Sequence, residues 1–361
     1  MGEPLMRIGM VGAGKISGAY LDTFPKLPEL QLTAVTDLDP ARAEEAAAKA
    51  PGAVAVKGGV DELLARDDVD AVLNLTIPAV HAEVARAALA AGKHVYGEKP
   101  LATTREEADG VLEHAAAAGL RVGCAPDTVL GTGTQTARKA VDDGLIGTPV
   151  AATAFMTTPG HERWHPDPEF YYRPGGGPLL DMGPYYFSSL VHLLGPVARV
   201  TGFSSTPRDE RVIGSGPRAG TRFAVEVPTH VTGVLEHASG ALSTLVMSFD
   251  VHAARLPRIE VHGTDGSVSV PDPNGFGGTV ELYRGTAGEW ETLPDEAGYR
   301  DASRGFGLAD MARGVASGEP HRASGELARH VLDVMLSLLE AAESGNAVAV
   351  ASTCERPAPI V

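Results

Sequence analysis

A glycine turn near the start of the chain constrains the fold more than any other feature. Residues 6–11 form a short apolar run typical of a buried parallel strand, and Gly12-Ala13-Gly14 follows at once. Apolar residues then recur at helical spacing over residues 15–24. Glycine permits a tight turn and a close approach of the backbone to a pyrophosphate, which the N-terminus of the next helix would stabilise. Strand, turn and helix in this order predict a dinucleotide cradle.

The third glycine of the usual Gly-x-Gly-x-x-Gly pattern is missing from this turn. Its place is taken by Ser17, and Gly18 comes one residue late. The departure is mild, because a small residue still allows the helix to pack closely against the strand.

An acidic residue at the end of the next predicted strand bears on the choice of cofactor. Residues 30–36 predict that strand, and Asp37 follows it at the distance where an acid accepts the adenosine ribose hydroxyls. A carboxylate there repels a 2′-phosphate, and the nearest arginine is Arg42, so NAD is favoured over NADP. Asp37 and Asp39 also suit a turn that caps the following helix, and both roles can hold.

Composition narrows the class of partner. The chain has 361 residues, a length that predicts two domains, and a net charge of −16, which argues against nucleic acid or an acidic membrane surface as partner. The sequence contains no secretory signal core and no run of roughly 18 apolar residues that could span a membrane. Cys124 and Cys354 give no disulfide framework and no metal-binding spacing, so we expect a cytoplasmic protein that binds a small molecule.

The pattern of elements predicts two domains of different architecture. Strands and helices alternate up to residue 126, which is typical of an α/β domain with a doubly wound parallel sheet. Beyond it, short β-type segments with glycine turns fill residues 197–293, and their alternation predicts an open-faced, largely antiparallel sheet. Helices are expected over residues 129–143, 184–194, 302–317 and 324–344. The predicted domains are 1–126 for the nucleotide and 127–361 for substrate and oligomerisation.

A lysine after a short apolar strand is the candidate for proton transfer. Oxidation of an alcohol by NAD removes a hydride from carbon and a proton from oxygen, and Lys99 in Glu98-Lys99-Pro100 could accept that proton. We expect Pro100 to hold the bond before it in cis. Glu98 and Lys99 could equally be a solvated ion pair at a strand end, and the segment alone leaves both interpretations open.

Several blocks of sequence resemble one family. Residues 72–81, 90–95 and 98–102, the segment Gly-Gly-Gly-Pro-Leu-Leu-Asp-Met-Gly at 175–183 and the C-terminal stretch from residue 318 are similar to the Gfo/Idh/MocA family, the glucose–fructose oxidoreductase and inositol dehydrogenase group. The resemblance implies a Rossmann domain followed by an open-faced sheet domain. It also implies NAD(P)-dependent oxidation or reduction of sugars, cyclitols or related polyols.

The resemblance also implies roles for individual residues. Lys99 matches the catalytic lysine, Asp181 the acid that binds substrate hydroxyls, and Glu98 a cofactor contact. Family members often carry histidine four residues after that acid, where this chain has Tyr185, which could pass a proton or shape the substrate site. The whole predicted cofactor-binding set is Gly12, Gly14, Lys15, Ile16, Asp37, Thr76, Pro78, His81, Glu98 and Lys99.

The loop before Asp181 is rich in histidine, arginine and aromatic residues. Such side chains suit a sugar-like ligand, which has apolar C–H faces and many hydroxyls, so we expect His165 and Tyr172 to contact substrate together with Lys99, Asp181 and Tyr185. A packed surface loop is the alternative. His161 and His165 have the spacing of a metal-binding pair, but no further ligand is evident, and we expect no metal.

Three functions are consistent with these observations. The first is a dehydrogenase or reductase for a sugar or cyclitol. The second is a redox-neutral enzyme in which bound NAD transiently oxidises a glycoside, and the third is a non-catalytic NAD-binding regulator. An open-faced sheet needs cover on its outer side, so we also expect a homodimer or homotetramer.

Overall fold

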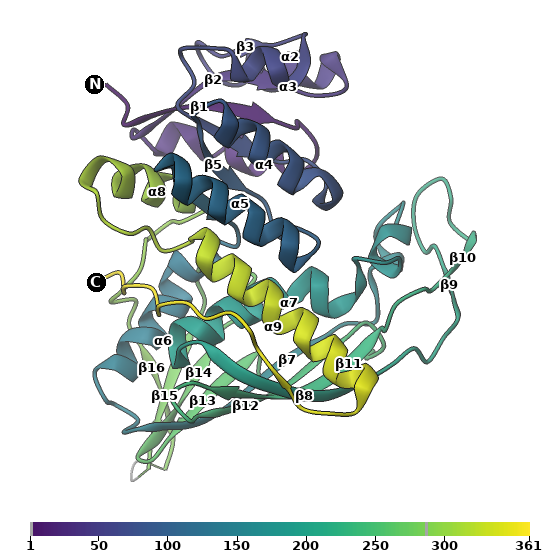
Figure 1. The fold of residues 1–361 in the computed structure, drawn as a ribbon. Helices are drawn as coiled ribbons and strands as arrows, with labels where there is room; N and C mark the ends of the chain where they lie inside the picture. Colours follow the sequence, from purple (N-terminus) through teal and green to yellow (C-terminus); the bar gives the residue numbers. More distant parts are fainter. Residues whose placement is uncertain (1–2, 286–287) are drawn as a thin grey trace. The chain divides into compact units, whose positions relative to one another are not determined.

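The computed structural model describes residues 3–285 and 288–361 and divides the chain into two compact units (Figure 1). The first unit runs to Gly131 and takes in Tyr299–Leu332, and the second comprises Thr132–Gly298 and Asp333–Val361. No helix in the described ranges combines the length and the apolar character needed to cross a lipid bilayer.

The first unit contains a six-stranded parallel sheet, which confirms the predicted α/β architecture. The strand order is β3-β2-β1-β4-β5-β6, and every pair in it is parallel. The order reverses between β1 and β4, which is the kind of switch point where such sheets bind ligands. The strands are β1 (Met6–Val11), β2 (Leu30–Thr36), β3 (Val54–Ala55), β4 (Ala71–Asn74), β5 (His94–Gly97) and β6 (Val122–Cys124).

Helices between these strands follow their sequence signals. Thr104 accepts a hydrogen bond from the Glu107 N–H and so caps α5, which ends at left-handed Gly119. The first helix is shorter than the sequence predicts, because the chain leaves the α-helical path before Pro25 and continues as the 3-10 turn η1 (Phe24–Lys26). The helices are α1 (Ser17–Leu21), α2 (Pro40–Ala48), α3 (Gly59–Leu64), α4 (His81–Ala90) and α5 (Arg105–Ala118).

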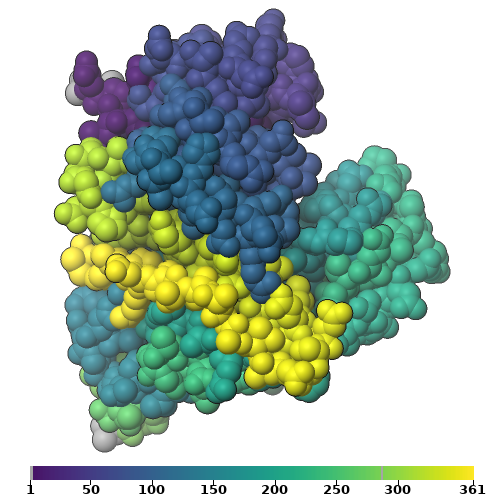
Figure 2. Space-filling view, viewed as in Figure 1, coloured from purple at the N-terminus to yellow at the C-terminus, as the bar shows by residue number. Residues whose placement is uncertain are grey.

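A late segment of the chain, Tyr299–Leu332, belongs to the first unit. The sequence instead predicts that the first domain ends at residue 126 and that everything after it belongs to the second. Helix α8 (Phe306–Ser317) places Leu308 and Met311 in the same apolar core as Met6 and Ile8. In the space-filling view, the yellow-green surface of α8 lies directly against the purple chain of that unit (Figure 2). Buried Asp127 accepts hydrogen bonds from the N–H groups of Gly305 and Gly307 at 2.9 and 3.1 Å. Each of the two compact units is therefore made of two separate stretches of the chain.

The second unit is built on a nine-stranded sheet in the order β16-β15-β14-β13-β7-β12-β11-β8-β17. Strands β7 and β12 pair parallel, and the other pairs are antiparallel, which confirms the largely antiparallel sheet. The strands are β7 (Pro149–Thr157), β8 (Val197–Ser205), β11 (His230–His237), β12 (Leu242–Ser248), β13 (Ile259–Gly263), β14 (Gly266–Val270), β15 (Val280–Arg284), β16 (Trp290–Leu293) and β17 (Val348–Ala349), with β9 (Glu210–Val212) and β10 (Arg222–Ala224) as a separate pair.

Helices cover one face of this sheet and leave apolar side chains exposed on the other. Helices α6 (Thr132–Asp142) and α7 (Gly177–Leu194) pack on it, and Leu338 of α9 (Gly325–Ser344) lies over β8 and β11 (Figure 1). Helix α9 packs closely over Gly233, where an added Cβ would lie 2.7 Å from the Leu338 side chain and 3.1 Å from the Thr201 carbonyl oxygen. On the opposite face Phe203 is 72% exposed and Val234 37%. The sheet is open-faced, as predicted.

Candidate active site

The glycine turn has the geometry of a phosphate cradle. Gly12 has φ +95°, and an added Cβ would lie 2.7 Å from the carbonyl oxygen of Leu75, so only glycine fits there. An added Cβ on Gly14 would meet no atom within 4 Å, which leaves the backbone open to a ligand. The turn borders a cleft of about 510 Å³ that is also lined by Lys15, Ser17, Gly18, Leu21, Arg42, Glu45, Ala46 and Lys49. These features fit the pyrophosphate of a dinucleotide.

The acidic residue after β2 is tied to this turn. Asp37 Oδ2 accepts the Ala13 N–H at 2.6 Å, and its Oδ1 accepts the Asp39 N–H at 2.8 Å. The cap of α2 is Asp39, whose side chain accepts the Ala41 N–H at 3.0 Å. The structure therefore separates the two roles, with Asp39 at the helix end and half-buried Asp37 beside the cradle. Contact between Asp37 and a ribose stays a prediction.

The predicted proton-transfer motif lies where β5 ends. Glu98 is 9% exposed, and its carboxylate accepts the Tyr20 hydroxyl at 2.9 Å and the Lys99 N–H at 3.2 Å. The Lys99-Pro100 peptide is cis, as the sequence predicts, and Lys99 is half-buried. Burial, with Glu98 adding to it, raises the pKa of Tyr20 well above its ordinary value. The pairing of Tyr20 with Glu98 is not predicted from the sequence, where Tyr20 is only one of the apolar positions of the first helix.

The segment after β4 is held against the same strand end. His81 is buried, with Nδ1 2.6 Å from the Pro100 carbonyl oxygen and Nε2 3.0 Å from that of Thr76. The Thr76 hydroxyl donates to Asn74 at 2.6 Å. Pro78 begins the 3-10 turn η2 (Pro78–Val80), which α4 follows. His81 thus joins the predicted cofactor segment at Thr76 to the Lys99-Pro100 segment.

Two more predicted cofactor residues stand at the start of α1. Ile16 is the N-cap of that helix and is half-buried, whereas Lys15 is exposed. The turn, the strand ends and these side chains all belong to one unit, and they fit a dinucleotide as a set. Their individual contacts with a cofactor remain predictions.

In the second unit, Asp181 lies inside a helix instead of ahead of one. The sequence predicts a helix from residue 184, but α7 begins at Gly177, because Pro178 in the first turn needs no N–H partner. Asp181 Oδ2 is 3.1 Å from Nε2 of His161, and the two side chains are 16% and 12% exposed. Tyr185 follows one turn later and is buried. From the sequence, His161 is considered only for a metal pair, which is not favoured, and its pairing with Asp181 is not predicted.

The loop that carries His161 is anchored by buried charge. Tyr172 is fully buried, its hydroxyl donates to Glu162, and burial followed by Glu162 raises its pKa. Arg211 bridges Glu162 at 2.9 Å and Asp250 at 2.5 Å. The structure gives Tyr172 an anchoring role, and its predicted contact with substrate remains untested.

Aromatic rings cluster around His161. Its ring centroid lies 4.5 Å from that of Phe249, 4.6 Å from Tyr171 and 5.3 Å from Trp164. The predicted substrate contact His165 packs against Trp164 at 5.4 Å and is half-buried. Trp164 is 53% exposed, so part of the cluster faces solvent. Within residues 3–285 and 288–361, no three His, Cys, Asp or Glu side chains are grouped to hold a metal ion.

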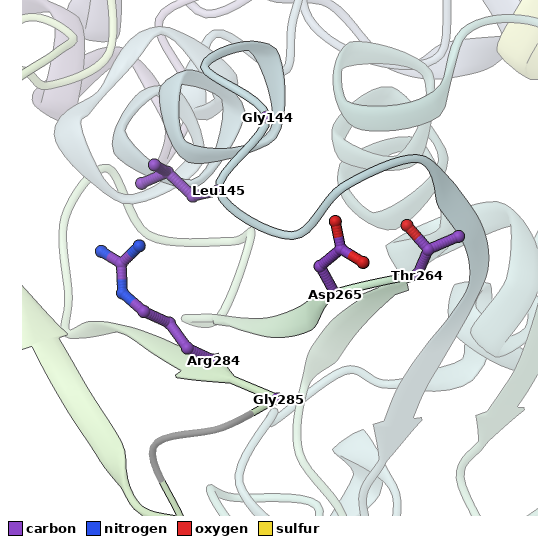
Figure 3. A pocket seen from close by; sticks show the side chains of 6 residues that line it. All are labelled: Gly144, Leu145, Thr264, Asp265, Arg284 and Gly285. Carbon is purple, nitrogen blue, oxygen red and sulfur yellow. The ribbon is translucent and has the colours of Figure 1, made fainter.

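Another cleft, of about 550 Å³, lies in the second unit (Figure 3). Thr264 and Asp265 come from the turn between β13 and β14, and Arg284 ends β15. Arg284 is paired with Glu291 at 2.9 Å. The lining residues are Gly144, Leu145, Thr264, Asp265, Arg284 and Gly285, none of which belongs to the predicted site.

Comparison with known proteins gives consistent matches over most of the chain. A family model described as an oxidoreductase family with an NAD-binding Rossmann fold matches residues 6–125. A second, described as the GFO/IDH/MocA C-terminal domain, matches residues 134–269.

Individual relatives are similar over nearly their whole length. A dTDP-3,4-didehydro-2,6-dideoxy-alpha-D-glucose 3-reductase of Streptomyces antibioticus is 33% identical over 319 residues, 86% of this chain and 90% of that protein. A D-xylose 1-dehydrogenase (NADP(+)) 2 of Haloferax volcanii is 29% identical over 353 residues, 95% and 99% of the two chains. The crystal structure of an NAD binding oxidoreductase from Klebsiella pneumoniae superposes with a TM-score of 0.81 at 25% identity, covering 96% and 99%. With both family models matched and the nucleotide cradle in place, the chain belongs to the Gfo/Idh/MocA family of oxidoreductases.

Proposed function

We propose that the protein transfers a hydride between NAD and a hydroxyl or keto carbon of a sugar, cyclitol or related polyol, with Lys99 as the acid/base. The observation that carries this proposal is the position of Lys99, half-buried at the end of β5 and bonded through its N–H to buried Glu98. That strand end belongs to the same sheet as the glycine turn after β1.

In this proposal, the chain's own residues bind the substrate, orient it and take up its proton. NAD+, held at the glycine turn of Gly12 and Gly14, would supply the acceptor for the hydride that leaves the oxidised carbon. Lys99 Nζ, as the unprotonated amine, takes the proton from the hydroxyl oxygen and becomes an ammonium, while the alcohol becomes a carbonyl. Asp181 accepts hydrogen bonds from substrate hydroxyls and sets the orientation of the ring. Tyr185 lines the substrate site one helical turn from Asp181, and His165 contributes from the aromatic loop.

The preference for NAD rests on Asp37. Its carboxylate, held by the Ala13 N–H at 2.6 Å, would accept ribose hydroxyls and repel a 2′-phosphate. NADP is the weaker candidate, although the relative from Haloferax volcanii is named for it and Arg42 borders the cleft.

We also propose that the exposed face of the nine-stranded sheet pairs two copies of the chain in a homodimer or homotetramer. Phe203, Val234 and Leu242 on that face are 72%, 37% and 49% exposed, which is unusual for large apolar side chains of one sheet face. A monomer by light scattering at micromolar concentration would contradict this.

A single set of measurements tests the proposed reaction. The protein is titrated with NAD+ and NADP+, and the tighter cofactor is screened with sugars, cyclitols and glycosides for absorbance of the reduced nicotinamide, with Lys99→Ala as control. We expect tighter NAD+ binding and a signal with at least one polyol that Lys99→Ala loses while still binding NAD+. Tight binding with no absorbance change would favour the redox-neutral enzyme or the regulator, which product analysis by mass spectrometry separates.

A further inference from the structure

His161 and Asp181 form a side-chain pair that joins a loop to a helix within one unit. His161 begins the 3-10 turn η4 (His161–Arg163), and its Nε2 lies 3.1 Å from Oδ2 of Asp181 on α7. We propose that His161 is a positioning residue, which donates its Nε2–H to Asp181 and fixes the plane of the carboxylate that binds substrate. The inference rests on the proposed function in giving Asp181 that task.

Aromatic rings pack against the His161 imidazole on several sides, so its position 3.1 Å from the Asp181 carboxylate is fixed by the surrounding structure. Phe249, Tyr171 and Trp164 surround the ring with centroids 4.5, 4.6 and 5.3 Å away. The His161 backbone N–H donates to the Tyr172 hydroxyl at 3.2 Å. A ring packed in this way has few other rotamers, and it loses little entropy when it bonds to the carboxylate.

The backbone before His161 is fixed as well. Gly160 has φ +107°, a conformation that L side chains rarely adopt, and an added Cβ would collide with the Glu162 carboxylate. Glu162 is itself buried and held by Arg211 at 2.9 Å. This buried ion pair anchors the turn that aims His161 at α7.

The chemistry of the pair sets the direction of the hydrogen bond. An ionised carboxylate only accepts, so the proton of a neutral imidazole must lie on Nε2. A hydrogen bond to a charged acceptor is stronger than one between neutral groups and is directional. Asp181 therefore keeps one carboxylate orientation when a substrate hydroxyl arrives, which preorganises the reacting geometry.

Two substitutions separate the hydrogen bond from ring packing. His161→Phe keeps an aromatic ring among Tyr171, Phe249 and Trp164 but removes the donor, whereas His161→Gln restores an N–H donor near the position of Nε2. We expect His161→Phe to lower kcat about tenfold or more with a smaller change in the polyol KM and unchanged NAD+ affinity. His161→Gln should recover most of kcat. His114→Phe, which removes a half-buried imidazole on α5, is the matched control and should behave as wild type.

A spectroscopic readout keeps the test independent of turnover. In nitrogen-15 spectra of histidine-labelled protein, the signals lost in His161→Gln identify His161. We expect them to show a protonated Nε2 and to shift in Asp181→Asn. Wild-type kcat in His161→Phe, equal defects in the Phe and Gln variants, or His161 signals that ignore Asp181→Asn would each overturn the inference. If wild-type protein oxidised no polyol while the Asp181-dependent shift persisted, the proposed function would fail and the pairing would stand.

Discussion

The hydroxyl of Tyr20 donates a hydrogen bond to the buried carboxylate of Glu98 across 2.9 Å. Tyr20 lies on α1, directly after the glycine turn, and Glu98 precedes Lys99 at the end of β5. This bond links the cradle that fits the cofactor to the segment that carries the proposed acid/base, although the two residues are 78 positions apart in sequence.

The first prediction removes that bond. Tyr20→Phe leaves Glu98 with one donor fewer in a buried setting, and an unsatisfied charged acceptor of this kind costs about 1–3 kcal/mol. We expect a lower free energy of unfolding by that amount in urea denaturation and a several-fold loss of turnover. Tyr96→Phe is the matched control, because the Tyr96 hydroxyl is buried in the same unit with no hydrogen-bond partner among the described residues. Equal stability of the two variants would contradict the assigned role.

The second prediction concerns the cofactor. Asp37→Asn keeps an oxygen to accept the Ala13 N–H, now bonded at 2.6 Å, but removes the negative charge. We expect NADP+ affinity to rise about tenfold while NAD+ affinity falls only a few-fold, since the repulsion of a 2′-phosphate is lost and a ribose acceptor remains. Isothermal titration with both nucleotides measures this. Asp39→Asn, which alters an exposed helix cap, should leave the ratio unchanged, and a parallel shift in both variants would argue against Asp37 as the determinant.

The third prediction concerns the anchor of the aromatic loop. Arg211 is 2% exposed and bridges Glu162 and Asp250, so Arg211→Met leaves two carboxylates buried without their cation. Breaking a buried pair in this way costs about 3–5 kcal/mol. Exposed Arg222, paired with Glu210 between β10 and β9, is the comparison, and Arg222→Met should cost less than ~1 kcal/mol. Denaturant unfolding of both variants measures the difference, and similar values would refute the structural importance of the anchor.

Local signals predicted the parts of the fold that depend on neighbouring residues. The glycine turn and the cis bond at Pro100 follow from residues a few positions apart, and the structure contains both, with Asp37 beside the turn and its predicted ribose contact untested. The start of α7 was missed because Pro178 and Gly177 look like a loop when read as single residues, yet proline fits the first turn of a helix.

Contacts between distant segments could not be derived from spacing. Periodicity reports which face of an element is buried, but not which other element covers it. From sequence Tyr20 is only an apolar helix position, and His161 has only the spacing of a metal pair for which no further ligand is evident. The structure places Glu98 beside Tyr20 and Asp181 beside His161. The place of residues 299–332 in the first unit could not be predicted for the same reason. The sequence of an amphipathic helix shows which face is apolar, but not which other element packs against that face.

The last prediction is a loss of stability on mild acidification. His237 is buried, with Nδ1 2.8 Å from the Gly195 carbonyl oxygen and Nε2 2.7 Å from the Ser243 hydroxyl. Burial lowers its pKa below the ordinary value of 6.5, while the bond to Gly195 opposes the shift. The unfolded chain then binds the proton first, so the contribution of His237 is complete above pH 6.5 and is lost as pH falls toward the lower folded pKa.

We expect the free energy of unfolding to be about 1 kcal/mol lower at pH 5.5 than at pH 7.5 on account of this residue. His237→Gln, which cannot titrate, should reduce the difference between the two pH values even if it lowers stability at both. His321 in the first unit is also buried with a lowered pKa and contributes in the same direction, so the variant should keep part of the effect. Urea unfolding at both pH values measures the free energies of unfolding. If His237→Gln kept the wild-type pH dependence, the pKa of His237 would be the same in the folded and unfolded states.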